Sequence, residues 1–354
     1  MASGVFRGHL DLVQQSHVQG WAARGTSPVE VTVKVNDRPV GRVKPTIPRP
    51  DVEAAIGVIG VCGFDYHFES PITEGDVVSV CFPDATELTG SPSNAHAARL
   101  IELLHGIDRV KMSGLEFGPL DRPILGKDKA LIKYVDHADR LALLKKYEGT
   151  GSAGTIDRKS VYEVDFVWPG GALAKCVPEG AQFDFALASH VVEHTPDMIG
   201  WLRSIADVLV VGGLLNLAIP DKERSFDHRR RVTSTSTFIA NHINEATVPT
   251  AEQVIDHIAY VCEVGTSPPP HLANAMAVAT AVKSSGEYVD VHCQVFTQDS
   301  WLHVMEDLAE LDLIPFELVA FFPTRWGANE FIVSMRKSPG VSAAVRARSF
   351  RRWP

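Results

Sequence analysis

Three acidic side chains and a glycine stand where short apolar runs end, and together they could hold a polar ligand. The runs cover residues 114–117, 131–135 and 161–166, and the side chains are Glu116, Gly118, Asp136 and Asp165. A glycine lets the backbone approach a ligand closely because it has no Cβ. A carboxylate about twenty residues further on can accept both hydroxyls of a ribose. Asp165 is placed to accept from an adenine amino group, so the pattern predicts a nucleoside site.

A His-x-x-Glu-His segment at 190–194 follows the next apolar run. It matches the pattern of inverted zinc peptidases, in which both histidines lie on one face of a continuous helix. Pro196 follows almost at once, and proline disrupts helical hydrogen bonding. A zinc peptidase is therefore disfavoured, and we expect Glu193 and His194 to be structural.

From residue 111 onward, strands alternate with helices. This alternation predicts a Rossmann-like α/β domain with a mostly parallel sheet. An open sheet of this kind binds its ligand outside the carboxyl ends of its strands, where the acidic residues stand. The predicted strands cover residues 114–117, 131–135, 161–166, 183–188, 214–219, 316–322 and 330–335.

The chain divides into three predicted parts. Residues 1–92 carry short alternating strands, including a hairpin at 29–43, which is typical of a small all-β sandwich. Residues 93–337 form the α/β domain, with an inserted cap at about 222–290. The basic tail at 338–354 is expected to be disordered.

Composition excludes several classes of protein. The net charge of −9 over 354 residues argues against a nucleic-acid partner. The five cysteines are scattered and lack CxxC spacing, which predicts reduced thiols in a cytoplasmic protein. No signal peptide is expected, and no apolar stretch is long enough for an integral membrane segment.

From residue 111 to about 337, the chain resembles the class I S-adenosylmethionine-dependent methyltransferases. The resemblance is carried by Leu-Glu-Phe-Gly-Pro-Leu at 115–120, Tyr-Val-Asp at 134–136, Ser-His-Val-Val-Glu-His at 189–194 and Val-Leu-Val-Val-Gly-Gly at 208–213. The order of these segments is similar to the ubiquinone-biosynthesis type of O-methyltransferase. The resemblance implies a seven-stranded sheet and S-adenosyl-L-methionine as cofactor.

The resemblance also implies which residues hold this cofactor. Glu116 and Gly118 would line the methionine part, Asp136 would hold the ribose, and Asp165 with Phe166 would frame the adenine. Ser189, the first residue of the Ser-His-Val-Val-Glu-His motif, is also expected to bind the cofactor. One motif departs from the family, because its longer glycine-rich turn is reduced here to Glu-x-Gly-Pro-Leu.

A dinucleotide cofactor is disfavoured. No G-x-G-x-x-G follows the first strand of the α/β domain, and a pyrophosphate requires such amides at a helix N-terminus. Glu116 would repel a pyrophosphate, whereas it suits the positive charges of S-adenosylmethionine.

Methyl transfer to an alcohol requires alignment and a general base, because alcohols ionise far above neutrality. Three histidines are candidates. We expect His190 to rank first because it follows the fourth strand directly, while His228 and His292 bracket the cap. Relatives of the ubiquinone type bind a divalent metal at E-x-x-E-H, but His190 replaces a carboxylate here. Because a hard ion prefers oxygen ligands, no metal is expected.

The front domain resembles β-sandwich modules fused to bacterial glycosyltransferases and polysaccharide-assembly enzymes. Gly-Trp-Ala at 20–22, Arg-Pro-Asp at 49–51 and Gly-Phe at 63–64 carry this resemblance. It implies that the acceptor is a glycan, a nucleotide-sugar or a lipid-linked saccharide. A non-sugar small molecule as acceptor and a non-catalytic glycan-binding scaffold remain alternatives, and a homo-oligomer is left open.

Overall fold

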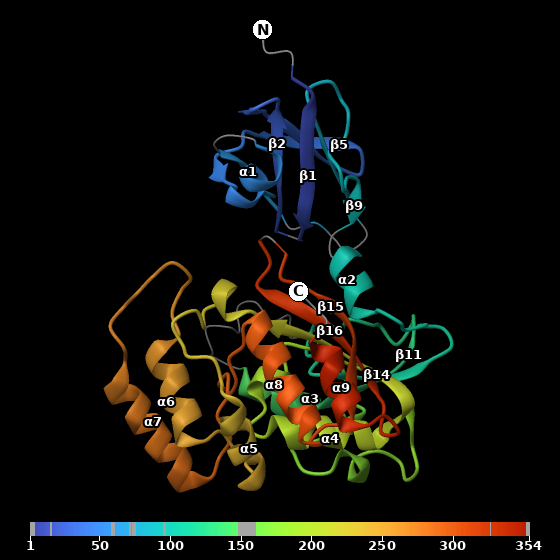
Figure 1. Cartoon of the computed structure of the whole chain (residues 1–354), viewed down its shortest axis with the longest axis vertical. Coiled ribbons are helices and arrows are strands. Elements are labelled where there is room, and N and C mark those ends of the chain that lie inside the picture. The colour runs from blue at the N-terminus through green and yellow to red at the C-terminus, as the bar shows by residue number, and fades with distance from the viewer. Residues whose placement is uncertain are drawn as a thin grey trace. The chain divides into compact units, whose positions relative to one another are not determined.

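The computed structural model describes residues 4–14, 16–57, 61–70, 72, 76–94, 97–147, 161–325 and 327–351 (Figure 1). The chain divides into two compact units. Unit 1 comprises residues 1–102 and 325–328, and unit 2 comprises residues 103–324 and 329–354. The predicted boundary at residue 92 therefore lies ten residues before the observed division.

Unit 1 contains two antiparallel sheets that share one apolar core. One sheet has the order β1-β2-β7-β6 with β3 beside β2, and the other has the order β5-β4-β8-β9. The core lies among Val18, Val33, Phe64 and Val80. The elements are β1 (Phe6–Val13), β2 (His17–Arg24), β3 (Ser27–Pro28), β4 (Val31–Val35), β5 (Arg38–Val43), β6 (Ile47–Pro48), α1 (Pro50–Ile56), β7 (Val61–His67), β8 (Val77–Cys81) and β9 (Ser93–Asn94).

The predicted hairpin at 29–43 corresponds to β4 and β5, which pair antiparallel. Asn36 and Asp37 at its turn both have positive φ, at 50° and 63°, as a two-residue hairpin turn requires. The helix α1 is an addition that the strand pattern did not predict. Its preceding residue, Arg49, is 4% exposed and pairs with Asp11 and Asp51, each at 2.6 Å.

Unit 2 is built on one seven-stranded sheet with the order β12-β11-β10-β13-β14-β16-β15. The first five strands in this order are parallel, whereas β16 runs antiparallel to both of its neighbours. This agrees with the predicted mostly parallel, Rossmann-like sheet. The strands are β10 (Ser113–Phe117), β11 (Leu131–Asp136), β12 (Phe166–Val167), β13 (Phe183–Ser189), β14 (Leu209–Pro220), β15 (Phe316–Phe322) and β16 (Glu330–Lys337).

Alternate residues of the sheet enter different cores. Leu115, Ala188 and Leu217 join α4, α8 and α9 in the main apolar cluster (Figure 1). Tyr134 and Leu187 face the other way and are covered by the segment 104–130. The helices are α2 (Ala97–Leu103), α3 (Arg140–Lys146), α4 (Met198–Val208), α5 (Thr235–Ile243), α6 (Ala251–Tyr260), α7 (Leu272–Ser285), α8 (Gln298–Glu310) and α9 (Ala343–Phe350).

The predicted insertion between β14 and α8 is helical and contains α5, α6 and α7. Thr250 begins α6 with a capping box, in which its hydroxyl accepts from the amide of Gln253. The helices α6 and α7 pack around Val254, Ala279 and Val282. The insertion therefore has a small apolar core of its own.

The prediction of a disordered tail at 338–354 is wrong for residues 338–351. They include α9, and its Ala347 and Phe350 are buried in the main cluster. Arg346 is 3% exposed and pairs with Asp312. The tail was predicted to be disordered because its arginines suggested exposure, although its apolar residues recur at helical spacing. Residues 352–354 lie outside the described part of the chain.

Among the helices that the structure describes, none combines the length and apolar character needed to cross a bilayer.

Candidate active site

The glycine predicted to line the site lies where the order of the sheet reverses. β10 has β11 on one side and β13 on the other, so loops diverge at its carboxyl end. Gly118 follows β10 with φ of +63°, a conformation that L side chains rarely adopt. A Cβ at this position would meet Val191 Cγ2 at 3.0 Å. The backbone here is therefore bare and close to the segment that follows β13.

Glu116 does not face the carboxyl edge of the sheet. It is 2% exposed, and its carboxylate accepts from the amides of Ile124 at 2.6 Å and Leu125 at 3.1 Å. These bonds tie the loop after β10 back to the strand. The structure therefore corrects the role implied for Glu116, because its carboxylate shapes the loop around Gly118.

Asp136 stands at the carboxyl end of β11, next to β10, as predicted. It is 9% exposed, and its Oδ1 accepts from the amide of His137 at 2.8 Å and lies 2.7 Å from His137 Nδ1. Among the described residues, no hydrogen bond or ion pair reaches its Oδ2. One carboxylate oxygen is thus fixed and the other remains for a ligand.

Asp165 does not follow the third strand of the sheet. The predicted strand at 161–166 is wrong, because β12 begins only at Phe166. The Asp165 carboxylate accepts from the amide of Tyr134 at 2.8 Å and pairs with Lys127 at 2.5 Å and Lys133 at 3.3 Å. Although burial raises the pKa of Asp165, Lys127 and the Tyr134 amide lower it more, so the net shift is downward. The adenine contact expected of Asp165 would have to displace these partners.

Phe166 and Ser189 lie at strand positions near the same edge. Phe166 pairs with Val135 in register and its ring centroid is 6.4 Å from that of Phe183. Ser189 is the last residue of β13, is half-buried, and pairs in register with Ala218. Both residues border the edge at which Asp136 and Gly118 lie.

The contacts of His190 argue against the role of general base that the sequence predicted for it. Its Nε2 lies 2.7 Å from Glu330 Oε2 and its Nδ1 lies 3.5 Å from Glu193 Oε1. Burial lowers the pKa of His190, but the two carboxylates outweigh it and raise this pKa to about 10. An imidazolium held between two carboxylates has no lone pair to accept a proton.

Both ring nitrogens of His228 lie close to main-chain carbonyl oxygens. Its Nδ1 lies 3.3 Å from the carbonyl oxygen of Ser225 and its Nε2 lies 3.2 Å from that of Thr266. These contacts tie together two segments of the insertion. His228 therefore has a structural setting, and the prediction that it is a base is not supported by its contacts.

His292 is the candidate whose setting suits proton transfer. It is 7% exposed, and its Nδ1 lies 2.6 Å from Asp227 Oδ2. Burial raises the pKa of Asp227, but His292 and Arg230 lower it on balance, so Asp227 stays ionised. A carboxylate at Nδ1 fixes the imidazole so that Nε2 is left to act on a ligand.

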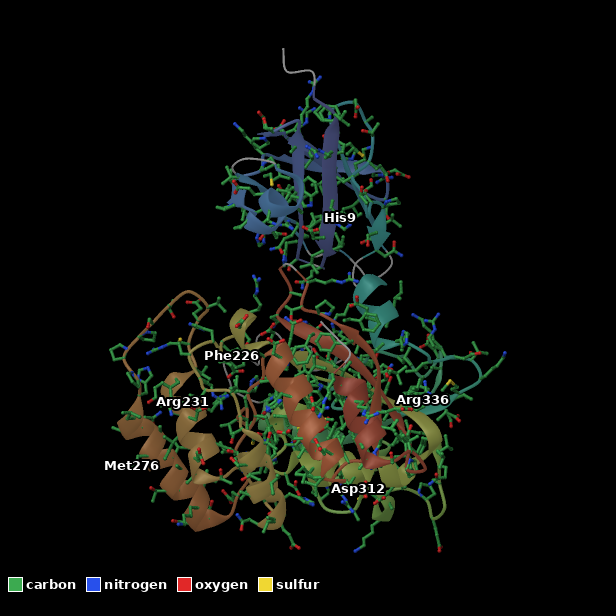
Figure 2. All side chains as sticks on the ribbon, viewed as in Figure 1. His9, Phe226, Arg231, Met276, Asp312 and Arg336 are labelled. Carbon is green, nitrogen blue, oxygen red and sulfur yellow. The ribbon has the colours of Figure 1, made fainter. Side chains whose placement is uncertain are left out.

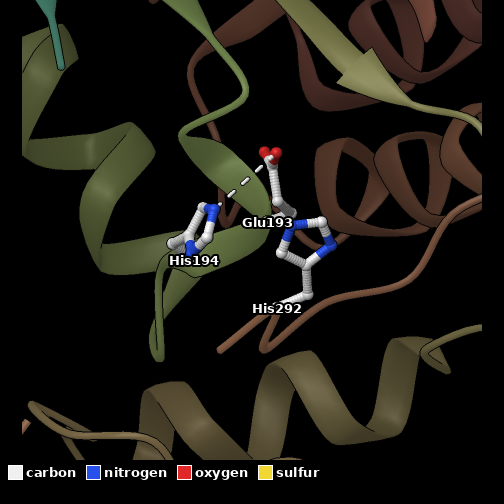
Figure 3. Close-up of side chains that lie close together, drawn as sticks. All are labelled: Glu193, His194 and His292. Atoms are coloured by element: carbon white, nitrogen blue, oxygen red, sulfur yellow. Dashed lines mark ion pairs between the residues drawn. The ribbon is translucent and has the colours of Figure 1, made fainter. Parts of the chain in front are cut away.

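His292 lies beside the pair Glu193 and His194. The amide of Gln294 donates to the carbonyl oxygen of Glu193 at 3.0 Å, which brings the segment after the insertion against the short 3₁₀ turn Val192–His194. One ligand atom from each of Glu193, His194 and His292 lies within 4.8 Å of the others (Figure 3). The turn is only three residues long, which agrees with the argument against a zinc-peptidase helix.

One further carboxylate, Asp290, supports this cluster, and sequence reasoning overlooked it. Asp290 Oδ1 lies 2.9 Å from His194 Nδ1, and Lys146 lies 3.0 Å from Asp290 Oδ2. Burial raises the pKa of Asp290, but His194 and Lys146 lower it well below its usual range. The sequence signal for Asp290 was its place two residues before His292.

Two half-exposed aromatic rings flank the histidines. The Phe226 ring centroid lies 4.7 Å from that of His292, and Phe226, labelled in Figure 2, is 41% exposed. The Tyr288 hydroxyl donates to the carbonyl oxygen of His194 at 3.3 Å, and its ring lies 6.2 Å from that of His137. Tyr288 therefore connects the Asp136 end of the site with the histidine cluster.

No protein-family model and no curated protein matches this sequence. Among solved structures, the CurJ carbon methyltransferase matches 66% of the chain at 12% identity with a TM-score of 0.33, and the chain spans only 51% of that protein. The CcbJ methyltransferase from Streptomyces caelestis matches 68% of the chain and 94% of its own length at 10% identity, with a TM-score of 0.35.

A Rhodobacter sphaeroides protein described as a zinc-dependent alcohol dehydrogenase matches 70% of the chain and 91% of its own length, at 12% identity with a TM-score of 0.37. Likenesses this distant carry no argument about function. The functional argument therefore depends on the strand order and the side chains described above.

Proposed function

We propose that unit 2 is an S-adenosylmethionine-dependent methyltransferase that transfers a methyl group to a hydroxyl of a carbohydrate. One observation carries the proposal: Gly118 and Asp136 end neighbouring parallel strands at the point where the strand order reverses. Open α/β sheets bind ligands at this place. The proposal agrees with the methyltransferase resemblance of residues 111–337.

The residues at this edge fit the adenosyl group. Asp136 keeps one oxygen for ribose hydroxyls, and the missing Cβ of Gly118 leaves backbone exposed where a side chain would crowd Val191. The two hydrogen bonds that Glu116 accepts from main-chain amides hold the loop that follows Gly118. When bound, the cofactor supplies an activated methyl group on a positively charged sulfur.

The acceptor side of the site is proposed to be the cluster at His292. The Asp227–His292 pair has the arrangement of a base oriented by a carboxylate, in which Nε2 takes the proton of the attacking hydroxyl. His292 thus replaces His190 as the residue that we assign to acceptor activation. His190 instead pairs with Glu330 at 2.7 Å and lies 3.5 Å from Glu193.

The side chains of the insertion favour a polar acceptor. Charged or hydrogen-bonding groups gather around His292, namely Asp227, Arg230, His257 and Asp290, and two aromatic rings, Phe226 and Tyr288, flank them. A sugar combines hydroxyls with apolar ring faces, and it matches this mixture better than a wholly apolar acceptor does. The expected relation of unit 1 to glycan-assembly modules points to the same class.

Binding and turnover test the two levels of the proposal separately. Calorimetry with S-adenosylmethionine and S-adenosylhomocysteine on the full chain should give saturable binding at one site. Methyl transfer should then be measured on a panel of nucleotide-sugars, with aromatic and aliphatic alcohols as matched controls. Cofactor binding with transfer only to non-sugars would reject the acceptor class. A folded chain that binds no cofactor would favour a non-catalytic scaffold.

A further inference from the structure

Glu193 is a buried carboxylate without a hydrogen-bond partner. It is 0% exposed, and neither of its carboxylate oxygens forms a hydrogen bond among the described residues. Its nearest partners are His190 Nδ1 at 3.5 Å and His194 Nε2 at 4.0 Å, both beyond ordinary hydrogen-bond length. The His190 imidazolium opposes the charge of Glu193, but no hydrogen bond among the described residues reaches its oxygens, and a buried carboxylate in this state is costly unless something further binds it.

The two histidines beside Glu193 are each held from behind by a carboxylate. Asp290 lies 2.9 Å from His194 Nδ1, and Asp227 lies 2.6 Å from His292 Nδ1. In both rings this leaves Nε2 as the nitrogen for a ligand. Histidines that bind metals nearly always contact a carboxylate, carbonyl or water through the other nitrogen. The Asp227 contact to His292 is a hydrogen bond, whereas the Asp290 contact to His194 is an ion pair without hydrogen-bond geometry. A carboxylate thus lies behind each of the two histidines beside Glu193.

We propose that Glu193, His194 and His292 bind one divalent transition-metal ion of the zinc type. This site differs from the one considered from the sequence, because His190 is excluded and His292 comes from beyond the insertion. Two imidazoles and one carboxylate favour zinc or a related nitrogen-binding ion over magnesium. The proposal departs from the expectation of no metal, and its ligands Glu193 and His292 are about a hundred positions apart in the sequence.

The distances require a modest closure around the ion. The three ligand atoms lie within 4.8 Å of one another, whereas atoms bound to one tetrahedral zinc are about 3.3 Å apart. Binding would therefore require the two imidazoles to move toward Glu193, within the limits that Asp227 and Asp290 set. Three protein ligands leave a fourth position, which a hydroxyl oxygen can take.

The role of the ion in catalysis rests on the proposed function, whereas its binding does not. A hydroxyl bound at the open position would lose its proton to bulk water more readily, because the ion would stabilise the oxyanion. His292 would then serve as a ligand of the ion, and the role of free base proposed above would apply only to the metal-free chain. Methyl transfer that persists after complete removal of metal would reject this role and leave His292 as the base.

Metal binding by the tag-free full chain tests the site directly. Zn²⁺ titration by calorimetry and elemental analysis after dialysis should give about one ion per chain, and Co²⁺ should give the intense visible bands of a tetrahedral site. His292→Ala and His194→Gln should each weaken binding by more than about 100-fold, and Asp290→Asn by about 10- to 100-fold. His303→Ala is the matched control, because His303 is 74% exposed and lies outside the cluster.

The outcomes are decisive in either direction. A folded wild-type chain that binds neither Zn²⁺ nor Co²⁺ saturably overturns the proposal, as does binding that His292→Ala leaves unchanged. Binding of Mg²⁺ in preference to Zn²⁺ also overturns it, because imidazole nitrogens do not select a hard ion. If one histidine variant fails to fold, the other histidine variant and the Co²⁺ spectrum of the wild-type chain decide, since intense visible bands require four-coordinate tetrahedral geometry at the ion.

Discussion

His190 Nε2 lies 2.7 Å from Glu330 Oε2, so the carboxyl end of β13 is tied to the beginning of β16. His190 has a φ of +54°, which is uncommon for a residue with a side chain. The same imidazole faces Glu193 at 3.5 Å. We therefore assign His190 the role of positioning the segment that carries Glu193 and His194, and we no longer propose it as the base.

His190→Gln should lower turnover by less than about tenfold, because glutamine keeps a donor to Glu330. The melting temperature should fall, because a charged contact between β13 and β16 is replaced by a neutral one. Thermal unfolding and steady-state kinetics on the same preparation check both effects. A loss of turnover by a thousandfold, with cofactor affinity intact, would return the role of base to His190.

His292→Ala should reduce turnover by about 10²- to 10⁴-fold, which is the usual contribution of a positioned acid–base group. Affinity for S-adenosylhomocysteine should change little, because His292 belongs to the acceptor side. The matched variant is His228→Ala; among the described residues, the polar contacts of this ring are to two main-chain oxygens and to Cys262. Equal losses in the two variants would show that the insertion merely needs its histidines to fold.

Gly118→Ala should weaken cofactor binding and lower the free energy of unfolding by about 1–2 kcal/mol, because alanine is strained at positive φ. The added Cβ would also meet Val191 at 3.0 Å. Gly180→Ala is the control, since Gly180 has a φ of +73° but no atom within 4 Å of its Cβ position. Equal effects on cofactor affinity would place Gly118 outside the site.

Asp165→Asn should destabilise the fold at neutral pH and leave cofactor affinity nearly unchanged, because Lys127 and Lys133 already hold the carboxylate. The pKa of Asp165 is lowered in the folded state, so its contribution is present above the unfolded value of 3.8 and is lost as pH falls below it. The difference in free energy of unfolding between the two chains, measured with urea, should therefore be smaller at pH 3 than at pH 7. A large loss of cofactor affinity would restore the adenine role.

Most of the sheet could be predicted from the sequence because β13 and β14 are long and apolar on both faces. Gly118 and Asp136 were placed correctly because they lie at the carboxyl ends of β10 and β11, which are shorter but mostly buried. β12 has only two residues, Phe166 and Val167, which is too short for a periodic signal. Asp165 was consequently expected at the carboxyl end of this strand, whereas it precedes β12.

Contacts between distant segments could not be predicted. Asp227 and His292 are 65 residues apart, and nothing in their spacing shows that the insertion folds back to join them. The helix α9 was missed for another reason, because its buried Arg346 is neutralised by Asp312, a partner on a separate segment. Charge in a sequence indicates exposure only when no such partner exists.

The affinity of the full chain for S-adenosylhomocysteine, measured by calorimetry beside Asp136→Ala and Glu163→Ala, tests the central claim most directly. Asp136 should accept ribose hydroxyls, and hydrogen bonds to a charged group contribute about 1.5–3 kcal/mol each, so its removal should cost about 100-fold or more in affinity. Glu163, whose side chain is 80% exposed, should be dispensable. Tight binding by the wild-type chain and its loss in Asp136→Ala alone is the predicted result. No binding by a folded wild-type chain, or equal affinity in the two variants, would contradict it.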